Sequence, residues 1–365
     1  MKILLVGEYS AFAKELKKGF VTLGHESIIF SWGDGAKRIK QNSEDYSCDF
    51  VRNKGKIISI LSRILMNIKL FFAIIKLSKL WRADACLIIN PSFVRERKMI
   101  HHLGLTINQI KSLCAKDSKI CLSACGDDYV FCTGINDLRL KRYYPCYSPE
   151  RAKKMKKDFV RTEKIVSTVI PTHYDYAETY RRYRELFHTR LSPTIPLPID
   201  VKAFKVNNVI GEKIVIFLGR MREEKGYKFM DEAVNIIQKK YSNIVRIPNQ
   251  YLSIDEYLKE LSRANIVLDQ CTGFSYGMNS LYALAMGKCV LSNNEPEGQL
   301  EYNVVDEIPI INIKNNVDMI VKKLSILIEN PQQIIELGKK ARLFVEKMHD
   351  GPIIAQKYIE VFNSM

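Results

Sequence analysis

Residues 264–291 read ANIVLDQCTGFSYGMNSLYALAMGKCVL, and this stretch decides the fold. An apolar run ends at Asp269, a glycine-bearing loop follows, and a helix rich in small side chains is expected from Met278 to Met286, closed by Gly287. Small side chains let such a helix lie close to a sheet, with its amino end aimed at a ligand. The stretch therefore predicts a strand–loop–helix unit of an α/β sheet that carries a binding site.

The same alternation of strands and helices occurs on both sides of a proline-rich connector. Apolar runs lie at 2–6, 27–30, 85–89, 120–124 and 165–170 in the first half, and at 214–218, 266–268 and 289–291 in the second. The segment IPLPID at 195–200 interrupts this pattern, because two prolines around an apolar residue suit an extended connector and no helix.

We therefore predict an α/β protein with two Rossmann-like, doubly wound domains that face a cleft. The first domain is expected at 1–195, the linker at 196–204 and the second domain at 205–345. Residues 346–365 are expected to form a helix that packs back toward the first domain.

Length, charge and cysteine content narrow the class of protein. The chain has 365 residues, of which 47% are hydrophobic. A chain of this length is expected to fold into two domains, because single hydrophobic cores stop growing at a smaller size. Its net charge of +16 lies almost entirely in residues 1–200, which hold 35 Lys+Arg against 20 Asp+Glu, and this asymmetry indicates an anionic partner. Nine cysteines, with no secretory signal and no zinc-type cluster, favour reduced thiols in the cytoplasm.

Two loops that follow the first strand of each half are candidates for phosphate binding, because ligands of such sheets lie beyond the carboxyl ends of strands. The first is Gly7-Glu8-Tyr9-Ser10, which lacks the GxGxxG fingerprint and is equally compatible with an ordinary turn.

The second loop starts at Gly219 and places Arg220 and Lys225 after its strand. Two fixed cations in this position can clamp a diphosphate and stabilise it as it departs. The alternative is a solvated basic loop, but position and residue type together favour a diphosphate site. Arg220 and Lys225 are therefore candidate catalytic residues.

A family resemblance is visible in these segments. The opening GEYSAFAKELKKGFVTLGHE at 7–26 resembles the first unit of glycosyltransferase family 4, and VIFLGRMREEKGYKFMDEAV at 215–234 resembles its phosphate-binding segment. The nucleotide-sugar region of that family resembles three segments of this chain: ANIVLDQ, YGMNSLYALAMGKCVL and EPE. Within the family, the chain is most similar to the branch that makes capsules and other surface polysaccharides. The resemblance implies the GT-B architecture, no metal or other cofactor, and retention of the anomeric configuration.

The sequence departs from that family at two positions. The family commonly carries two glutamates separated by seven residues, and here Phe274 and Tyr282 take their places. Contacts to ribose and sugar are then expected from Tyr282 itself or from Glu295 and Glu297. The full set of expected donor-binding residues is Gly7, Glu8, Tyr9, Ser10, Gly219, Asn249, Tyr251, Gly277, Met278, Asn279, Tyr282, Glu295 and Glu297.

A pair of carboxylates ends one strand of the first half, in KICLSACGDDY at 119–129. The resemblance places this segment where family members carry a histidine near the reacting sugar. Asp127 or Asp128 could orient the acceptor hydroxyl or accept its proton, and Asp127 is taken as the candidate catalytic residue. The alternative is an aspartate that caps a helix.

Residues 51–83 form a basic segment with eight cations and no acidic residue. Its apolar positions 57, 60, 61, 64, 65, 68, 71, 72 and 75 fall on one helical stripe. The cations interrupt any apolar run long enough to span a bilayer, so the segment favours binding to an anionic membrane surface. The alternative is a helix whose stripe packs on the first sheet.

These observations together predict a glycosyltransferase that moves a sugar from a nucleotide-sugar donor, a UDP-sugar by preference, to a lipid-linked saccharide. The second domain would hold the donor and the basic first domain the acceptor, at the cytoplasmic face of the membrane. A sugar-nucleotide 2-epimerase and a non-catalytic nucleotide-sugar-binding protein are the alternatives. A nucleic-acid partner is not expected, because it leaves the segments at 220–225 and 269–287 unexplained.

Overall fold

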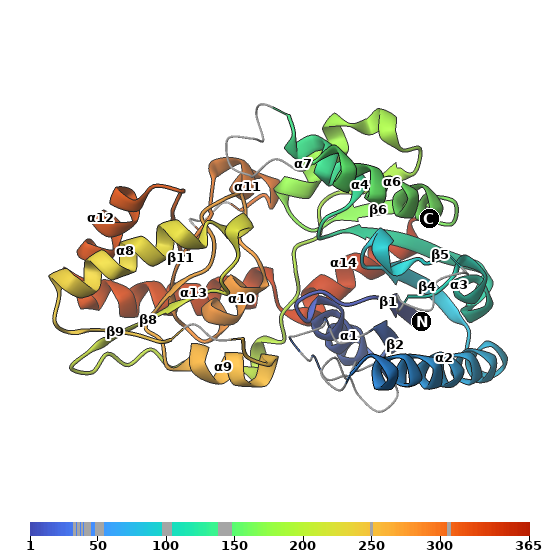
Figure 1. The fold of residues 1–365 in the computed structure, drawn as a ribbon, viewed down its shortest axis with the longest axis horizontal. Coiled ribbons are helices and arrows are strands. Elements are labelled where there is room, and N and C mark those ends of the chain that lie inside the picture. The colour runs from blue at the N-terminus through green and yellow to red at the C-terminus, as the bar shows by residue number, and fades with distance from the viewer. Residues whose placement is uncertain are drawn as a thin grey trace.

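The computed structural model describes residues 1–31, 34, 37, 39, 45–47, 55–96, 104–137, 148–248, 251–304 and 308–365, with only the backbone of 55–60, 62, 63, 66 and 67. Within these ranges the chain forms two parallel sheets, each flanked by helices, and the two lobes lie side by side (Figure 1). The predicted α/β fold with two doubly wound domains is confirmed.

The first sheet has the described strand order β3-β2-β1-β4-β5-β6-β7, all parallel. Its strands are β1 (Lys2–Val6), β2 (Glu26–Ser31), β3 (Tyr46–Ser47), β4 (Ala83–Ile88), β5 (Cys114–Ala124), β6 (Thr168–Pro171) and β7 (Arg190–Leu191). Its helices are α1 (Phe12–Thr22), α2 (Gly55–Leu80), α3 (Ile107–Leu113), α4 (Tyr129–Ile135), α6 (Pro149–Glu163) and α7 (Tyr174–Arg182), with short turns η2 (Pro91–Phe93) and η3 (Arg184–Leu186). The order reverses between β1 and β4, so a binding crevice is expected beyond their carboxyl ends.

The second sheet has the described order β12-β11-β10-β8-β9, also parallel. Its strands are β8 (Ile214–Leu218), β9 (Ile244–Arg246), β10 (Ile266–Leu268), β11 (Cys289–Ser292) and β12 (Ile310–Asn312). Its helices are α8 (Tyr227–Lys240), α9 (Ile254–Ser262), α10 (Met278–Ala285), α11 (Pro296–Glu301), α12 (Val317–Glu329) and α13 (Pro331–Met348), with η5 (Glu223–Lys225) after β8. Here the order reverses between β8 and β10.

The chain crosses between the lobes twice, and the two crossings are hydrogen-bonded to each other. The first crossing runs through residues 195–200 to η4 (Val201–Ala203), and the second joins α13 to α14 (Gly351–Asn363). Ile199 donates its N–H to the carbonyl of His349 at 2.8 Å, and its carbonyl accepts the N–H of Gly351 at 2.9 Å. These bonds join the two strands of chain at the hinge between the lobes.

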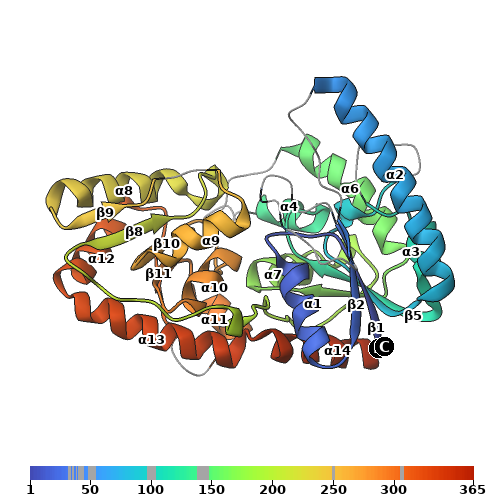
Figure 2. The ribbon, with the colours of Figure 1, turned by 90° about the horizontal axis from the view of Figure 1, so that it is seen from below.

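Helix α14 returns to the first lobe and packs along α1 (Figure 2). The two backbones come so close at Gly19 that a Cβ there would lie 2.2 Å from the carbonyl oxygen of Gly351. Further along, the Phe20 ring lies edge-on to Tyr358 at 6.4 Å. Residues 346–365 thus help to fix α1, the helix that follows the loop after β1.

Helix α2 lies on the outer side of the first lobe (Figure 2). One apolar face of this helix is exposed. It docks through Leu70, Ile74 and Leu77, which are buried. The stripe identified from the sequence is a different one: its described members are exposed, namely Leu61, Ile64, Leu65, Ile68, Phe71, Phe72 and Ile75. The alternative in which this stripe packs on the first sheet is therefore wrong, because another face of the helix does so. No helix in the described ranges is both long and apolar enough to cross a membrane.

Candidate active site between the two domains

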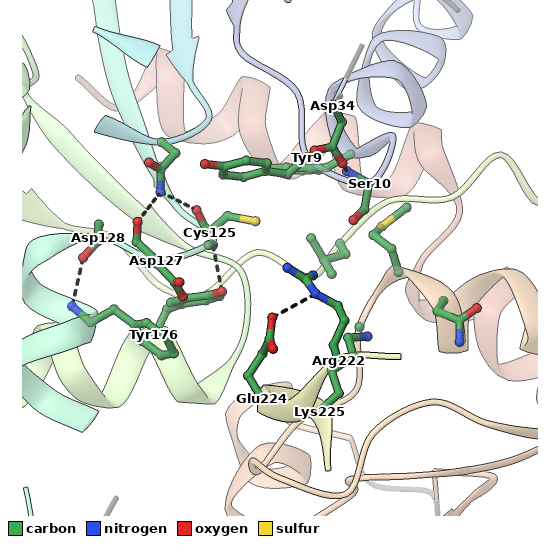
Figure 3. Close-up of a pocket in the computed structure, with 18 of the residues that line it drawn as sticks. Tyr9, Ser10, Asp34, Cys125, Asp127, Asp128, Tyr176, Arg222, Glu224 and Lys225 are labelled. Carbon is green, nitrogen blue, oxygen red and sulfur yellow. Dashed lines mark hydrogen bonds and ion pairs between the residues drawn. The ribbon is translucent and has the colours of Figure 1, made fainter. Parts of the chain in front are cut away.

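The reversal points of the two sheets face one another across a single cavity of about 790 Å³. The first lobe supplies the loop after β1, the turn after β4 and the residues after β5 and β6, and the second lobe supplies the loops after β8 and β10. Figure 3 shows side chains from both lobes pointing into this space. Its volume is that of a ligand pocket of 300–1,000 Å³.

Two residues of the loop after β1 line the cavity, and two are buried in the protein interior. Tyr9 and Ser10 line the cavity, whereas Gly7 and Glu8 are buried outside its lining. Gly7 has a φ of 102°, and a Cβ there would lie 2.1 Å from the Phe93 ring. The Glu8 carboxylate accepts the N–H groups of the first turn of α1 at 3.2 and 3.0 Å, so it occupies the amides that the sequence pattern offered to a phosphate.

Ser10 is held by a pair of residues that sequence reasoning missed. Its N–H donates to the Asp34 carboxylate at 2.7 Å, and its hydroxyl accepts from Lys37 Nζ at 2.7 Å. Lys37 and Asp34 also form an ion pair. Both line the cavity, and burial together with the facing Arg220 lowers the pKa of Lys37 even though Asp34 raises it. Lys37 lies 31 residues after the end of β1, and no motif links its position to that strand, so no signal in the sequence could have identified it.

Asp127 and Asp128 have different surroundings. Asp128 is buried, accepts the Phe131 N–H at 2.8 Å at the start of α4, and accepts the Tyr180 hydroxyl at 2.8 Å. Burial raises its pKa to about 6. Asp127 lies at the cavity wall with a partly exposed carboxylate that pairs with Arg151. The capping alternative thus describes Asp128, and Asp127 is the more exposed of the two carboxylates at the cavity wall.

Arg220 and Lys225 both line the cavity. Lys225 forms an ion pair with a carboxylate, whereas Arg220 hydrogen-bonds to a carbonyl. Lys225 donates to Asp269 at 2.8 Å, and the Asp269 side chain is 0% exposed. Burial would raise the pKa of Asp269, but Lys225 and the Ser280 hydroxyl hold it below its usual range. Arg220 donates to the Leu252 carbonyl at 3.0 Å, and no carboxylate in the described part of the chain lies within ion-pairing distance of it. Arg220 is therefore the cation with charge left to offer an anion.

The amino end of α10 reaches the cavity, as the opening stretch of sequence predicted. Gly277, Met278 and Asn279 line it, and Tyr282 follows one turn later with its ring buried. The Asn279 amide oxygen accepts the Tyr257 hydroxyl. Burial raises the pKa of Tyr282, so its hydroxyl remains a neutral hydrogen-bonding group.

Several expected donor-binding residues lie outside the cavity lining. Gly219 is buried at the end of β8, and Tyr251 is 78% exposed. Glu295 is buried and pairs with Lys314 at 3.0 Å while accepting from Asn312 at 2.8 Å. Glu297 is half-buried in the first turn of α11, and Asn249 falls outside the described residues.

Comparisons with known proteins agree with this architecture. No protein-family model matches the sequence, and no curated protein matches it. Among solved structures, sucrose-phosphate synthase from Thermosynechococcus elongatus aligns over 100% of both chains with a TM-score of 0.63 and 12% identity. An α-glucosyltransferase in complex with UDP-glucose and DNA containing an abasic site aligns over 100% of this chain and 99% of its own, with a TM-score of 0.61 and 13% identity.

A third similar structure is that of HepE from Anabaena in complex with UDP, with a TM-score of 0.57, 12% identity and full coverage of both chains. This chain has the GT-B fold. Full-length alignment at such low identity establishes the architecture alone. In the GT-B fold of this chain, the cavity lies between the reversal points of the two sheets.

Proposed function

We propose that this chain is a glycosyltransferase that moves a sugar from a UDP-sugar to the hydroxyl of a saccharide acceptor. The observation that carries the proposal is Arg220, a half-buried cation without a carboxylate partner in the described chain, at the reversal point of the second sheet. A leaving nucleoside diphosphate gains negative charge as the glycosidic bond breaks, and a cation fixed there stabilises that charge. The UDP and UDP-glucose in the similar GT-B structures support the choice of nucleotide.

The roles of the two lobes follow from where the charges lie. The second lobe would hold the diphosphate through Arg220 and Lys225, with Tyr282 and Asn279 on the nucleoside side. Asp127 of the first lobe would orient the acceptor hydroxyl or accept its proton. We propose that the configuration at the anomeric carbon is retained. We also propose that no metal ion takes part, because Arg220 supplies the positive charge with which a metal ion would otherwise neutralise the diphosphate.

A donor panel tests the proposal. The protein is incubated with UDP-glucose, UDP-galactose, UDP-N-acetylglucosamine and the GDP and ADP counterparts, with and without EDTA, and the release of nucleoside diphosphate is measured. We expect transfer to an alkyl glycoside, or slow hydrolysis, with one UDP-sugar and no effect of EDTA. A new sugar nucleotide would instead identify a 2-epimerase, and binding without turnover a non-catalytic protein. The anomeric proton coupling of the product reports retention or inversion.

We further propose that α2 holds the enzyme on an anionic membrane surface, where the acceptor is a lipid-linked saccharide of surface-polysaccharide synthesis on the cytoplasmic side. The outward stripe on α2 is apolar, with Phe72 64% exposed, and exposed cations such as Lys69 and Lys76 lie on the same helix. An apolar face with cations beside it is the pattern of helices that lie in the plane of an anionic bilayer.

Vesicle binding tests this part. The protein should sediment with phosphatidylserine vesicles and release as salt shortens the Debye length. Phe72→Ser should weaken binding roughly 10-fold, the scale of one apolar side chain. Leu343→Ser is the matched control, since Leu343 is equally exposed at 66% but lies on α13 of the second lobe. Equal binding to neutral and anionic vesicles at all salt concentrations would show that the cations of α2 do not contribute to membrane binding. No binding to neutral or anionic vesicles would contradict the membrane proposal.

A further inference from the structure

The first lobe presents a histidine to the cavity that the proposed mechanism does not yet use. His173 stands at the start of α7, lines the cavity, and has a side chain that is 14% exposed. Its Nδ1 lies 3.0 Å from Asp175 Oδ2, and the Asp175 side chain is 0% exposed. A carboxylate only accepts, so this contact places a proton on Nδ1 and, in that tautomer, leaves the lone pair on Nε2.

The imidazole ring is held in one orientation. Asp175 fixes the ring from one side, and the Tyr176 ring lies 4.5 Å from it between centroids. Tyr176 is fixed in turn, because its hydroxyl accepts the Gly126 N–H at 2.7 Å. The His173 ring makes no capping hydrogen bond to α7. Such support is typical of a side chain positioned to act on a ligand.

A second buried histidine in the same protein shows what a purely structural role looks like. Both ring nitrogens of His349 are used within the protein, since Nε2 lies 2.9 Å from the Tyr276 hydroxyl and Nδ1 lies 2.7 Å from the Leu197 carbonyl. In His173 only Nδ1 is used, and none of the described residues hydrogen-bonds its Nε2. The free lone pair of Nε2 is thus available to a donor in the cavity.

We propose that Nε2 of His173 accepts a hydrogen bond from a sugar hydroxyl in the cavity, which makes it a further substrate-contacting residue; this rests on the proposed transferase function. The hydroxyl belongs either to the transferred sugar or to the acceptor. On the acceptor, the contact comes from a hydroxyl other than the attacking one and turns the attacking hydroxyl toward Asp127, so no proton passes to the imidazole. On the transferred sugar, the contact orients the ring and no proton moves.

Asp175 also connects the imidazole to the other lobe. Its second carboxylate oxygen accepts the N–H of Phe274 at 2.8 Å, and Phe274 belongs to the loop between β10 and α10 that lines the donor side. Asp175 is therefore a positioning residue that fixes the ring when the two lobes are docked.

Substitution of His173 tests the inference with the UDP-sugar that the wild type consumes in the donor panel. His173→Ala should lower kcat/KM by about 100-fold or more, while the Kd for UDP stays within twofold of wild type. His188→Ala is the matched control, because His188 is an exposed histidine of the same lobe, outside the cavity. Asp175→Asn should lower kcat with little change in KM when kcat is normalised to the folded fraction counted by UDP titration, whereas a loss of folded protein would leave the normalised kcat unchanged.

The arms of the experiment distinguish the two sources of the hydroxyl. Loss of both hydrolysis and transfer places the contact on the transferred sugar, and loss of transfer alone places it on the acceptor. Turnover within threefold of wild type on both arms, with an unchanged Tm, would overturn the inference. If His173→Ala lowers the Tm, His173→Gln is measured against the same limits. A wild type that neither binds UDP nor consumes any donor refutes the transferase function instead.

Discussion

Removal of the Arg220 guanidinium should damage catalysis far more than folding. Its only described hydrogen bond is to the Leu252 carbonyl, so Arg220→Ala should cost about 1 kcal/mol of unfolding free energy. Its charge, by contrast, is uncompensated until an anion binds. One electrostatic contact to developing charge contributes about 2–4 kcal/mol to the transition state. Arg220→Ala should therefore lower kcat/KM by roughly 30- to 1,000-fold.

Lys225 is a less direct probe of the same site, because it is paired with the buried Asp269. Lys225→Ala leaves that carboxylate without its partner, and breaking a buried pair in this way costs about 3–5 kcal/mol of stability. Its loss of activity would then combine catalysis with folding. The double variant Lys225→Ala/Asp269→Asn removes both charges and should recover much of the stability but little of the activity.

Steady-state kinetics measures the loss of catalysis, and calorimetric titration with UDP measures the loss of diphosphate binding. Thermal unfolding measures the loss of stability separately. Arg220→Ala should weaken the binding of UDP more than that of uridine, since uridine lacks the diphosphate. Arg220→Ala/Lys225→Ala should lose less than the sum of the two single losses, because both cations act on one leaving group. Wild-type turnover and UDP affinity in Arg220→Ala would refute this assignment of the diphosphate site.

Three further substitutions follow from the same contacts. Asp127→Asn should lower turnover by about 100-fold while UDP affinity is kept, and turnover within a few fold would make Asp127 a structural partner of Arg151. Lys37→Met should weaken UDP binding roughly 10-fold, the scale of one charge-assisted hydrogen bond, with exposed Lys239→Met as control. Burial lowers the pKa of His349 to about 4, so the unfolded chain binds its proton first as the pH falls below 6.5. The unfolding free energy should then drop by about 3 kcal/mol between pH 6.5 and 4, and His349→Gln, compared by chemical denaturation, should lack that drop.

The sequence carried enough information for the architecture because the signals of a buried parallel sheet are local. Near-continuous apolar runs mark strands covered on both faces, and each ends where a polar or glycine residue begins the next loop. The small side chains of 278–286 and the left-handed Gly287 place α10 within two residues of its observed bounds. Likewise, the position of Arg220 and Lys225 after β8 follows from sequence order alone.

What escaped prediction depends on contacts between distant segments. Asp269 lies 44 residues after Lys225, so no spacing rule foretells that it neutralises the lysine. Glu8 was expected to face the donor, but it turns back onto the amides of its own helix. On α2 both faces are apolar, and periodicity could not tell which one packs against the first sheet. His173 carried no motif, and the contact that anchors its partner Asp175, the N–H of Phe274, comes from the other lobe.

Calorimetric titration of the wild-type protein with UDP and with uridine tests the central claim most directly. If the cavity between the lobes is a nucleotide-sugar site in which Arg220 meets the diphosphate, UDP should bind at least about 30-fold more tightly than uridine, a difference of about 2 kcal/mol, and rising salt should reduce the difference. Equal affinity for UDP and uridine, or no binding of either, would contradict the account.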